Sequence, residues 1–119
     1  MKALLYAAVA LVSLALPAYA HTPLTSSVPA AGGTVPAPVK EIVLDFGGDV
    51  RLTALALTDA AGAKKAVADL PTVIQKKFTI AVRDDLAPGA YIATWRAVGA
   101  DTHVVSGEIK FSVAAAHSH

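Results

Sequence analysis

The chain has 119 residues, enough for one domain and too few for two. Its ten basic and nine acidic side chains leave a formal charge near zero. This balance argues against nucleic acid or an anionic membrane surface as a partner, because both call for a basic excess. The absence of cysteine excludes disulfides, a cysteine nucleophile, iron–sulfur clusters and blue-copper sites.

The first 20 residues have the three-part pattern of a secretory signal peptide. A short positive segment ending at Lys2 precedes an almost unbroken apolar run over residues 3–16, and Ala18 and Ala20 place small residues where a signal peptidase cleaves. The run is shorter than the roughly 20 residues that a membrane-spanning helix needs, so we predict cleavage rather than stable membrane anchoring. Cleavage removes the single methionine, and the mature chain then begins at His21.

Short alternating segments follow, separated by turn residues. Over residues 41–46, Ile42, Leu44 and Phe46 fall on one face, with Glu41, Val43 and Asp45 opposite, and this alternation predicts a half-buried strand. Further strands are predicted over residues 52–58, 77–82, 89–98 and 108–113, with turns at 59–62 and 86–89. The one helical candidate, residues 60–70, is interrupted by Gly62. Strands at this spacing predict an all-β sandwich or barrel.

Four aromatic residues supply most of the large side chains that the strands would bury. We assign Phe46, Tyr91, Trp95 and Phe111 to the core. The alternative for Trp95 is a platform for a ligand, but buried aromatic residues mainly contribute apolar area.

His21 is the first candidate for metal chemistry. An N-terminal histidine offers a free α-amine and a ring Nδ1 that can chelate one ion, and their ordinary pKa values of about 7.7–8.0 and 6.5 make deprotonation feasible near neutral pH. Cu(II) stands at the top of the divalent affinity series and competes best with those protons. The alternative is that cleavage leaves a histidine there by chance.

Asp101 and His103 form the second candidate. In an extended segment their side chains would project to the same side, because side chains alternate along a strand. With His21 they would give three nitrogens and one carboxylate oxygen, a set that suits tetragonal Cu(II). By itself an Asp-x-His pair is a weak signal, and the alternative is a surface pair in a loop.

His21 and the Asp101–His103 pair both belong to a sequence pattern that is known from one protein family. From Gly89 the chain reads GAYIATWRAVGADTHVVSGEIKFSV, and near the start it has His21, Leu24, Ser27, Pro29, Ala30, Gly32, Pro38, Val43, Leu44 and Phe46. This sequence resembles the CopC-type (YobA-like) periplasmic copper-binding, copper-resistance family over nearly the whole mature chain.

The resemblance implies an immunoglobulin-like or cupredoxin-like Greek-key β-sandwich of about seven strands over residues 21–113. It also implies one Cu(II) per chain, held by His21, Asp101 and His103. The protein would then be a periplasmic, monomeric, non-enzymatic copper-binding protein for storage, homeostasis, resistance or delivery to an inner-membrane copper transporter of the CopD type. A copper-dependent oxidase or oxygenase using the N-terminal histidine chelate is the alternative, and a metal-free adhesion module is a third.

Three features depart from the family pattern or lie outside it. Thr102 replaces the usual glycine between the ligands, and Gly47 and Gly48 stand where an acidic residue is common, although Asp49 follows. The Met-rich Cu(I) site of some members must be missing, because the mature chain has no methionine.

The C-terminal tail, residues 114–119, carries His117 and His119. It is expected to be a disordered end, and the alternative is a second, weak metal site. For Arg96 we expect a structural salt bridge, or a hydrogen bond to Asp101 as the alternative.

Overall fold

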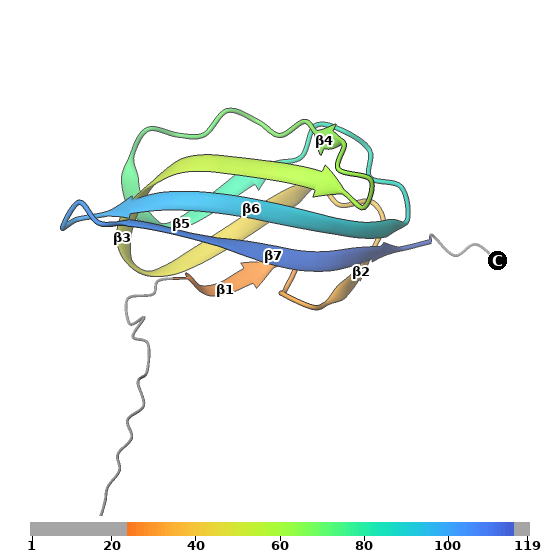
Figure 1. Cartoon of the computed structure of the whole chain (residues 1–119), viewed down its shortest axis with the longest axis horizontal. Coiled ribbons are helices and arrows are strands. Elements are labelled where there is room, and N and C mark those ends of the chain that lie inside the picture. The colour runs from red at the N-terminus through yellow and green to blue at the C-terminus, as the bar shows by residue number, and fades with distance from the viewer. Residues whose placement is uncertain (1–23, 116–119) are drawn as a thin grey trace, which may run out of the picture.

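The computed structural model describes residues 24–115, which form seven β-strands and no helix (Figure 1). The strands are β1 (Leu24–Val28), β2 (Thr34–Pro36), β3 (Glu41–Asp59), β4 (Lys64–Lys65), β5 (Ile74–Ala81), β6 (Gly89–Gly99) and β7 (Val104–Ala114). No helix with the length and apolar character needed to cross a membrane occurs in this part of the chain. The predicted signal peptide, His21, His117 and His119 lie outside the described residues.

Strand β3 belongs to both layers of the sandwich. Its first half, residues 41–46, lies between β1 and β5 and pairs antiparallel with both. Its second half, residues 50–59, pairs with β6, which in turn pairs with β7. The short strands β4 and β2 pair with the end of β3 and the end of β7. All seven strands are therefore connected through β3, and Figure 1 shows it crossing from one layer to the other.

The sequence predicted two separate strands where the structure has the single strand β3. The prediction of a break was wrong, because the pairing with β5 shifts register between Asp45 and Val50 and then resumes, so the strand continues through this irregularity.

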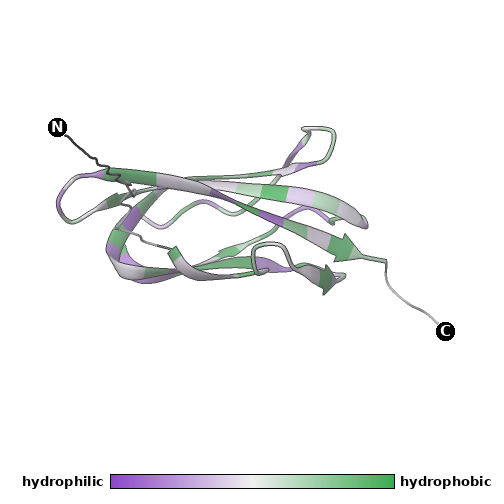
Figure 2. Ribbon diagram, turned by 60° about the horizontal axis from the view of Figure 1, so that its bottom comes forward, coloured by the Kyte–Doolittle hydropathy of each residue, from purple (hydrophilic) through white to green (hydrophobic). Residues whose placement is uncertain are grey.

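The core lies between the two layers and is built from alternate residues of each strand. Along β3 the side chains of Ile42, Leu44 and Phe46 are buried, while those between them are not. Apolar and polar bands succeed one another along the strands in Figure 2. This alternation buries one face of each strand and leaves the other to solvent, as the sequence predicted.

Aromatic rings fill the centre of this core. Phe46 packs edge-to-face against Phe78 and Trp95, with ring centroids 5.9 and 5.2 Å apart, and Tyr91 stacks on Phe111 at 5.7 Å. Trp95 is 5% exposed, which confirms it as a core residue rather than a ligand platform. The hydroxyl of Tyr91 donates a hydrogen bond to a backbone carbonyl four residues earlier, at 2.6 Å, so this ring is buried with its polar group satisfied.

Gly107 leaves room for the Trp95 ring. The two residues are partners in the β6–β7 ladder, and a Cβ atom on Gly107 would lie 2.8 Å from Cζ2 of Trp95. We expect Gly107→Ala to lower the free energy of unfolding by about 1–3 kcal/mol, the usual effect of overpacking a core. Urea denaturation measures it, with Ser106→Ala on the outer face as the control. Equal midpoints for the two variants would contradict this reading of Gly107.

One end of the sandwich brings together three distant parts of the chain. Leu24 pairs with Phe46 just before the bend in β3, and Val50 just after the bend pairs with Gly99, the last residue of β6. The turn between β6 and β7 follows at once, so the start of the described chain, the bend and this turn share one end, called here the hairpin end (Figure 1). The chain leaves β7 at the opposite end.

Candidate metal centre

Asp101 and His103 lie in the turn that joins β6 to β7. The backbone N–H of Gly99 donates to the carbonyl of His103 at 3.0 Å, and the N–H of Thr102 donates back to the carbonyl of Gly99 at 2.9 Å. These bonds close a tight turn in which Thr102 has a φ of 68°, in the left-handed region. The turn continues two long strands, so its ends are held by the β6–β7 ladder.

The turn brings the two predicted donors into direct contact. Nδ1 of His103 lies 2.7 Å from Oδ2 of Asp101, and the backbone N–H of His103 donates to Oδ1 of Asp101 at 3.1 Å. The interpretation of an extended segment was wrong, because residues 101–103 form a turn. The side chains converge through the closure of the hairpin rather than through strand alternation.

Both side chains are open to solvent, 68% for Asp101 and 83% for His103. The hydrogen bond from His103 holds the pKa of the Asp101 carboxyl below its ordinary value, and the same bond raises the pKa of His103 above its ordinary value. A metal ion that takes the imidazole nitrogen must therefore compete with a proton that the carboxylate helps to hold.

In the metal-free protein, we expect Asp101→Asn to return the pKa of His103 towards its ordinary value of 6.5. The raised pKa of His103 stabilises the fold below pH 6.5, and this effect is lost as pH rises through the folded-state value. The lowered pKa of Asp101 stabilises the fold above pH 3.8, and this effect is lost as pH falls through its folded-state value. The Asp101–His103 pair therefore contributes its full stabilisation of the fold between pH 3.8 and 6.5.

NMR titration of the ring protons of His103 measures the shift directly, with Asp49→Asn, an exposed carboxyl at the bend of β3, as the matched control. If His103 titrates at the same pH with and without the Asp101 carboxylate, the hydrogen bond in the turn does not persist in solution.

Thr102 stands in a backbone conformation that glycine adopts more easily. A left-handed conformation costs a residue with a side chain roughly 1–2 kcal/mol. Because Thr102 is exposed, its replacement disturbs no core contact, and we expect Thr102→Gly to raise the free energy of unfolding by up to about 1 kcal/mol, since the greater freedom of glycine in the unfolded chain offsets part of the gain. A lower thermal midpoint for Thr102→Gly than for the parent would show that the threonine side chain, whose hydroxyl bonds the carbonyl of Asp101, contributes more than its backbone costs.

The donors of the turn fit a borderline metal ion but do not complete a site. They comprise one carboxylate and one imidazole, whose Nε2 makes no hydrogen bond within the described residues. Nowhere in residues 24–115 do three His, Asp or Glu side chains come close enough together to hold one ion. A third His, Asp or Glu ligand for an ion bound here must therefore come from outside the described part of the chain.

Gly99 also shapes the turn that holds the donor pair, a role that was not predicted from the sequence. Both of its backbone polar groups close the turn, and a Cβ atom on it would lie 3.2 Å from Oδ1 of Asp101. A glycine directly after a strand is a common turn signal that could have identified it.

Two other residues considered from the sequence lie apart from the donor pair. Asp49 is exposed at the bend of β3, outside any group of metal-binding side chains in the described residues. Arg96 is exposed and forms no ion pair there, so the predicted salt bridge and the bond to Asp101 were both wrong. Arg96 points outward on β6 while its neighbours Trp95 and Ala97 face the core.

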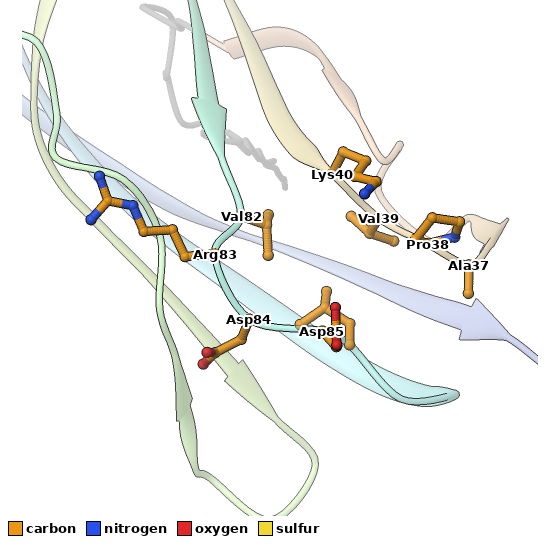
Figure 3. A pocket seen from close by; sticks show the side chains of 9 residues that line it. Ala37, Pro38, Val39, Lys40, Val82, Arg83, Asp84 and Asp85 are labelled. Carbon is orange, nitrogen blue, oxygen red and sulfur yellow. The ribbon is translucent and has the colours of Figure 1, made fainter.

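A hollow of about 370 Å³ lies at the opposite end of the sandwich (Figure 3). It is lined by residues 37–40, before β3, and residues 82–86, after β5. One of its carboxylates, Asp84, accepts a hydrogen bond from the backbone N–H of Ala66 at 2.7 Å and points away from the hollow in Figure 3. The hollow holds no histidine and is separate from the donor pair.

These features define a class: an all-β sandwich that presents an exposed carboxylate–imidazole pair on the turn at one end. Residues 24–114 match the CopC domain, and the chain belongs to the CopC domain family. The family assignment and the all-β sandwich predicted from the sequence are thereby confirmed.

The chain is similar to proteins named Copper resistance protein C. It is 34% identical to the one from Escherichia coli over 110 residues, covering 84% of this chain and 86% of the relative. It is 32% identical to the one from Pseudomonas syringae pv. tomato over 111 residues, covering 81% and 82%.

Solved structures show the same similarity. PcoC from Escherichia coli, described as a methionine-rich copper resistance protein, matches with a TM-score of 0.64 at 34% identity, covering 78% of this chain and 99% of PcoC. CopC from Methylosinus trichosporium OB3b matches with a TM-score of 0.70 at 25% identity, covering 83% and 99%.

Proposed function

We propose that this protein binds one Cu(II) ion through His21, Asp101 and His103, and that it serves copper resistance or homeostasis in the periplasm. The observation that carries the proposal is the hydrogen-bonded Asp101–His103 pair, held open to solvent at the hairpin end. The names of the relatives point to the same metal.

The path of the chain supports His21 as the third ligand. Leu24 lies at the hairpin end, where it pairs with Phe46, and His21 precedes it by three residues. Three residues span up to about 10 Å. This short separation in the chain supports the proposal that His21 shares an ion with the donors of the turn, to which it would supply its α-amine and ring Nδ1.

The hydrogen bond in the turn favours one binding mode for His103. Its Nδ1 is engaged by Asp101, so the free Nε2 is the nitrogen that would meet the ion. A carboxylate that accepts a hydrogen bond from the ring nitrogen not bound to the metal fixes the orientation of the imidazole and raises its basicity. Nδ1 and Nε2 lie on opposite edges of the ring, so Asp101 would bind the same ion only after its hydrogen bond to Nδ1 opens.

The donor set favours Cu(II) over Cu(I). Three nitrogens and a carboxylate oxygen suit a tetragonal Cu(II) centre, whereas Cu(I) prefers thiolate and thioether sulfur. The chain has no cysteine and a single methionine, Met1, in the predicted signal peptide. In this respect it differs from PcoC, whose description as methionine-rich implies many thioethers.

The proposed role follows from the compartment and the site. Cleavage of residues 1–20 would release a mature monomer into the periplasm. The short tail begins at residue 115 rather than at 114 as predicted, because Ala114 pairs with Pro36 and ends β7. In the periplasm the protein would hold Cu(II), or deliver it to an inner-membrane copper transporter of the CopD type. We propose a binding protein rather than an oxidase, because a carboxylate ligand tends to hold copper as Cu(II), and none of the named relatives is described as an oxidase.

Electron paramagnetic resonance of the protein that begins at His21 tests this function. With one equivalent of Cu(II), we expect a single type-2 signal with nitrogen couplings that persists when ascorbate is added. A competition titration should show Cu(II) bound far more tightly than Zn(II), following the divalent affinity series. A preference for Cu(I), or rapid reduction with peroxide turnover, would refute the binding role.

A further inference from the structure

The indole N–H of Trp95 is a buried donor without an acceptor in the described part of the chain. Trp95 is 5% exposed, and its Nε1 is the one buried side-chain nitrogen or oxygen atom that makes no hydrogen bond within residues 24–115. Buried polar groups in native proteins almost always have a partner. The acceptor for this N–H is therefore either a water molecule or a part of the chain outside residues 24–115.

The nitrogen-bearing edge of the Trp95 ring reaches strand β7. A Cβ atom on Gly107, the ladder partner of Trp95, would lie 3.2 Å from Nε1. At this level β7 pairs with β6 on one edge, whereas on the other edge β2 pairs only with residues 112–114. The unpaired N–H therefore lies behind the last strand of its layer, on the side of the sandwich that no further strand of residues 24–115 covers.

Strand β1 lies across the sandwich from this ring. Since β5 pairs with β3 both before and after the bend, it follows one edge of β3, and β1 and β6 lie along the other edge, one in each layer. Leu24 pairs with Phe46, whose ring packs edge-to-face against Trp95. The side chain of Leu24 also packs against the core. The described chain therefore begins close to the unpaired donor.

Strand alternation relates Thr22 to this donor. Thr22 and Pro23 lie outside the described residues, directly before Leu24. Because Leu24 faces the core, an extension of β1 by two residues would turn Pro23 outward and Thr22 inward, about 7 Å further along the chain. Proline suits the edge position of such an extension, because it has no N–H to pair. Thr22 would then bring a hydroxyl oxygen, which can accept a hydrogen bond, to the side where Trp95 lacks one.

We propose that the Thr22 hydroxyl accepts a hydrogen bond from Nε1 of Trp95, and that this bond positions His21 for copper. Residues 21–23, called here the N-terminal arm, then dock at the hairpin end as an extension of β1. The inference rests on the proposed function, because it assigns Thr22 and Trp95 as the residues that position the ligand His21. An arm that is held in place before copper arrives loses less conformational freedom when the ion binds.

The indole N–H signal tests the hydrogen bond in the copper-free protein that begins at His21. Trp95 is the single tryptophan, so a proton–nitrogen correlation spectrum contains one such signal. Thr22→Val removes the hydroxyl and nearly preserves the shape of the side chain, and we expect it to move the indole proton signal upfield. Thr22→Ser keeps a hydroxyl and is the matched control, with a signal close to that of the parent. The same signal in Thr22→Val and in the parent would overturn the proposal and leave water as the acceptor.

Copper affinity tests the positioning role. We expect Thr22→Val to bind Cu(II) about 10–100-fold more weakly than the parent, the usual effect of losing a group that orients a ligand, and Thr22→Ser to bind nearly as tightly as the parent. Replacing Trp95 with 3-benzothienylalanine, which has sulfur in place of the N–H and nearly the same shape, should weaken binding by the same factor. Adding Thr22→Val to that protein should then cause no further loss, because both changes remove one hydrogen bond. Losses that multiply in the combined protein would show that the two residues act independently, and the proposal would be wrong.

The two measurements also separate this inference from the proposed function. If the indole signal responds to Thr22→Val but the protein binds no Cu(II), the hydrogen bond stands, while the copper site and the positioning role are both wrong. If Cu(II) binds as proposed but neither the indole signal nor the affinity responds to Thr22→Val, the proposed function stands and this inference alone fails.

Discussion

A single glycine added before His21 should lower the Cu(II) affinity of the mature protein by orders of magnitude. The added residue converts the α-amine of His21 into an amide, whose nitrogen lone pair is delocalised into the carbonyl group and is a poor donor. The chelate of amine and ring Nδ1 is then lost, while the donors of the β6–β7 turn remain. Each tenfold loss of affinity corresponds to about 1.4 kcal/mol.

The experiment compares two proteins, one that begins at His21 and one with the additional glycine, by competition against a chelator of known affinity. A third protein, with one glycine added after His119, controls for the change in length. The fold should be unchanged in all three, because the additions precede β1 or follow β7. Equal affinities in the first two proteins would show that the α-amine is not a ligand and that the site does not depend on signal-peptide cleavage.

Alternation was sufficient to predict the long strands because each buries one face. Residues 41–46 and 89–98 have this pattern, and both lie within strands of the sandwich. The short strands β1, β2 and β4 were not predicted, because they owe their existence to pairing with β3 and β7 rather than to a local pattern. Thr25 and Ser26 in β1, for example, are both polar and show no alternation, yet the hydroxyl of Thr25 donates a hydrogen bond to the carbonyl of Asp45 on β3.

The donor pair was predicted from residue type and spacing, but its geometry was not. Spacing suggested that Asp101 and His103 share a side of an extended segment, whereas a turn closed by Gly99 brings them within 2.7 Å. Nothing in the local pattern revealed that Thr102 adopts a φ of 68°, since threonine disfavours that region.

The strand directions show why the tail histidines cannot join this site in the same chain. Strand β7 starts next to His103 and runs for 11 residues to Ala114, a span of about 33 Å at 3.3 Å per residue. The five residues from 115 to 119 can reach back roughly 17 Å at full extension. His117 and His119 therefore remain at a distance from the turn, and any metal they bind is a separate ion.

Replacing His103 with alanine should lower Cu(II) affinity by more than about 100-fold, whereas removing residues 116–119 should leave it unchanged. Losing a residue that merely orients a ligand costs about 10–100-fold, so losing a ligand nitrogen should cost more. The truncation begins after Ala115, because Ala114 pairs with Pro36 of β2 and belongs to the fold. His103→Ala is not expected to unfold the protein, since the side chain is 83% exposed.

Isothermal titration with a competing chelator measures both variants against the protein that begins at His21. Circular dichroism should show the same strand content in all three. Thr102→Ala provides the matched control for a change within the turn, because Thr102 is also exposed and has no ligand atom of comparable affinity. Copper retained by His103→Ala and lost on truncation would place the site in the tail, and the assignment of Asp101 and His103 would then be wrong.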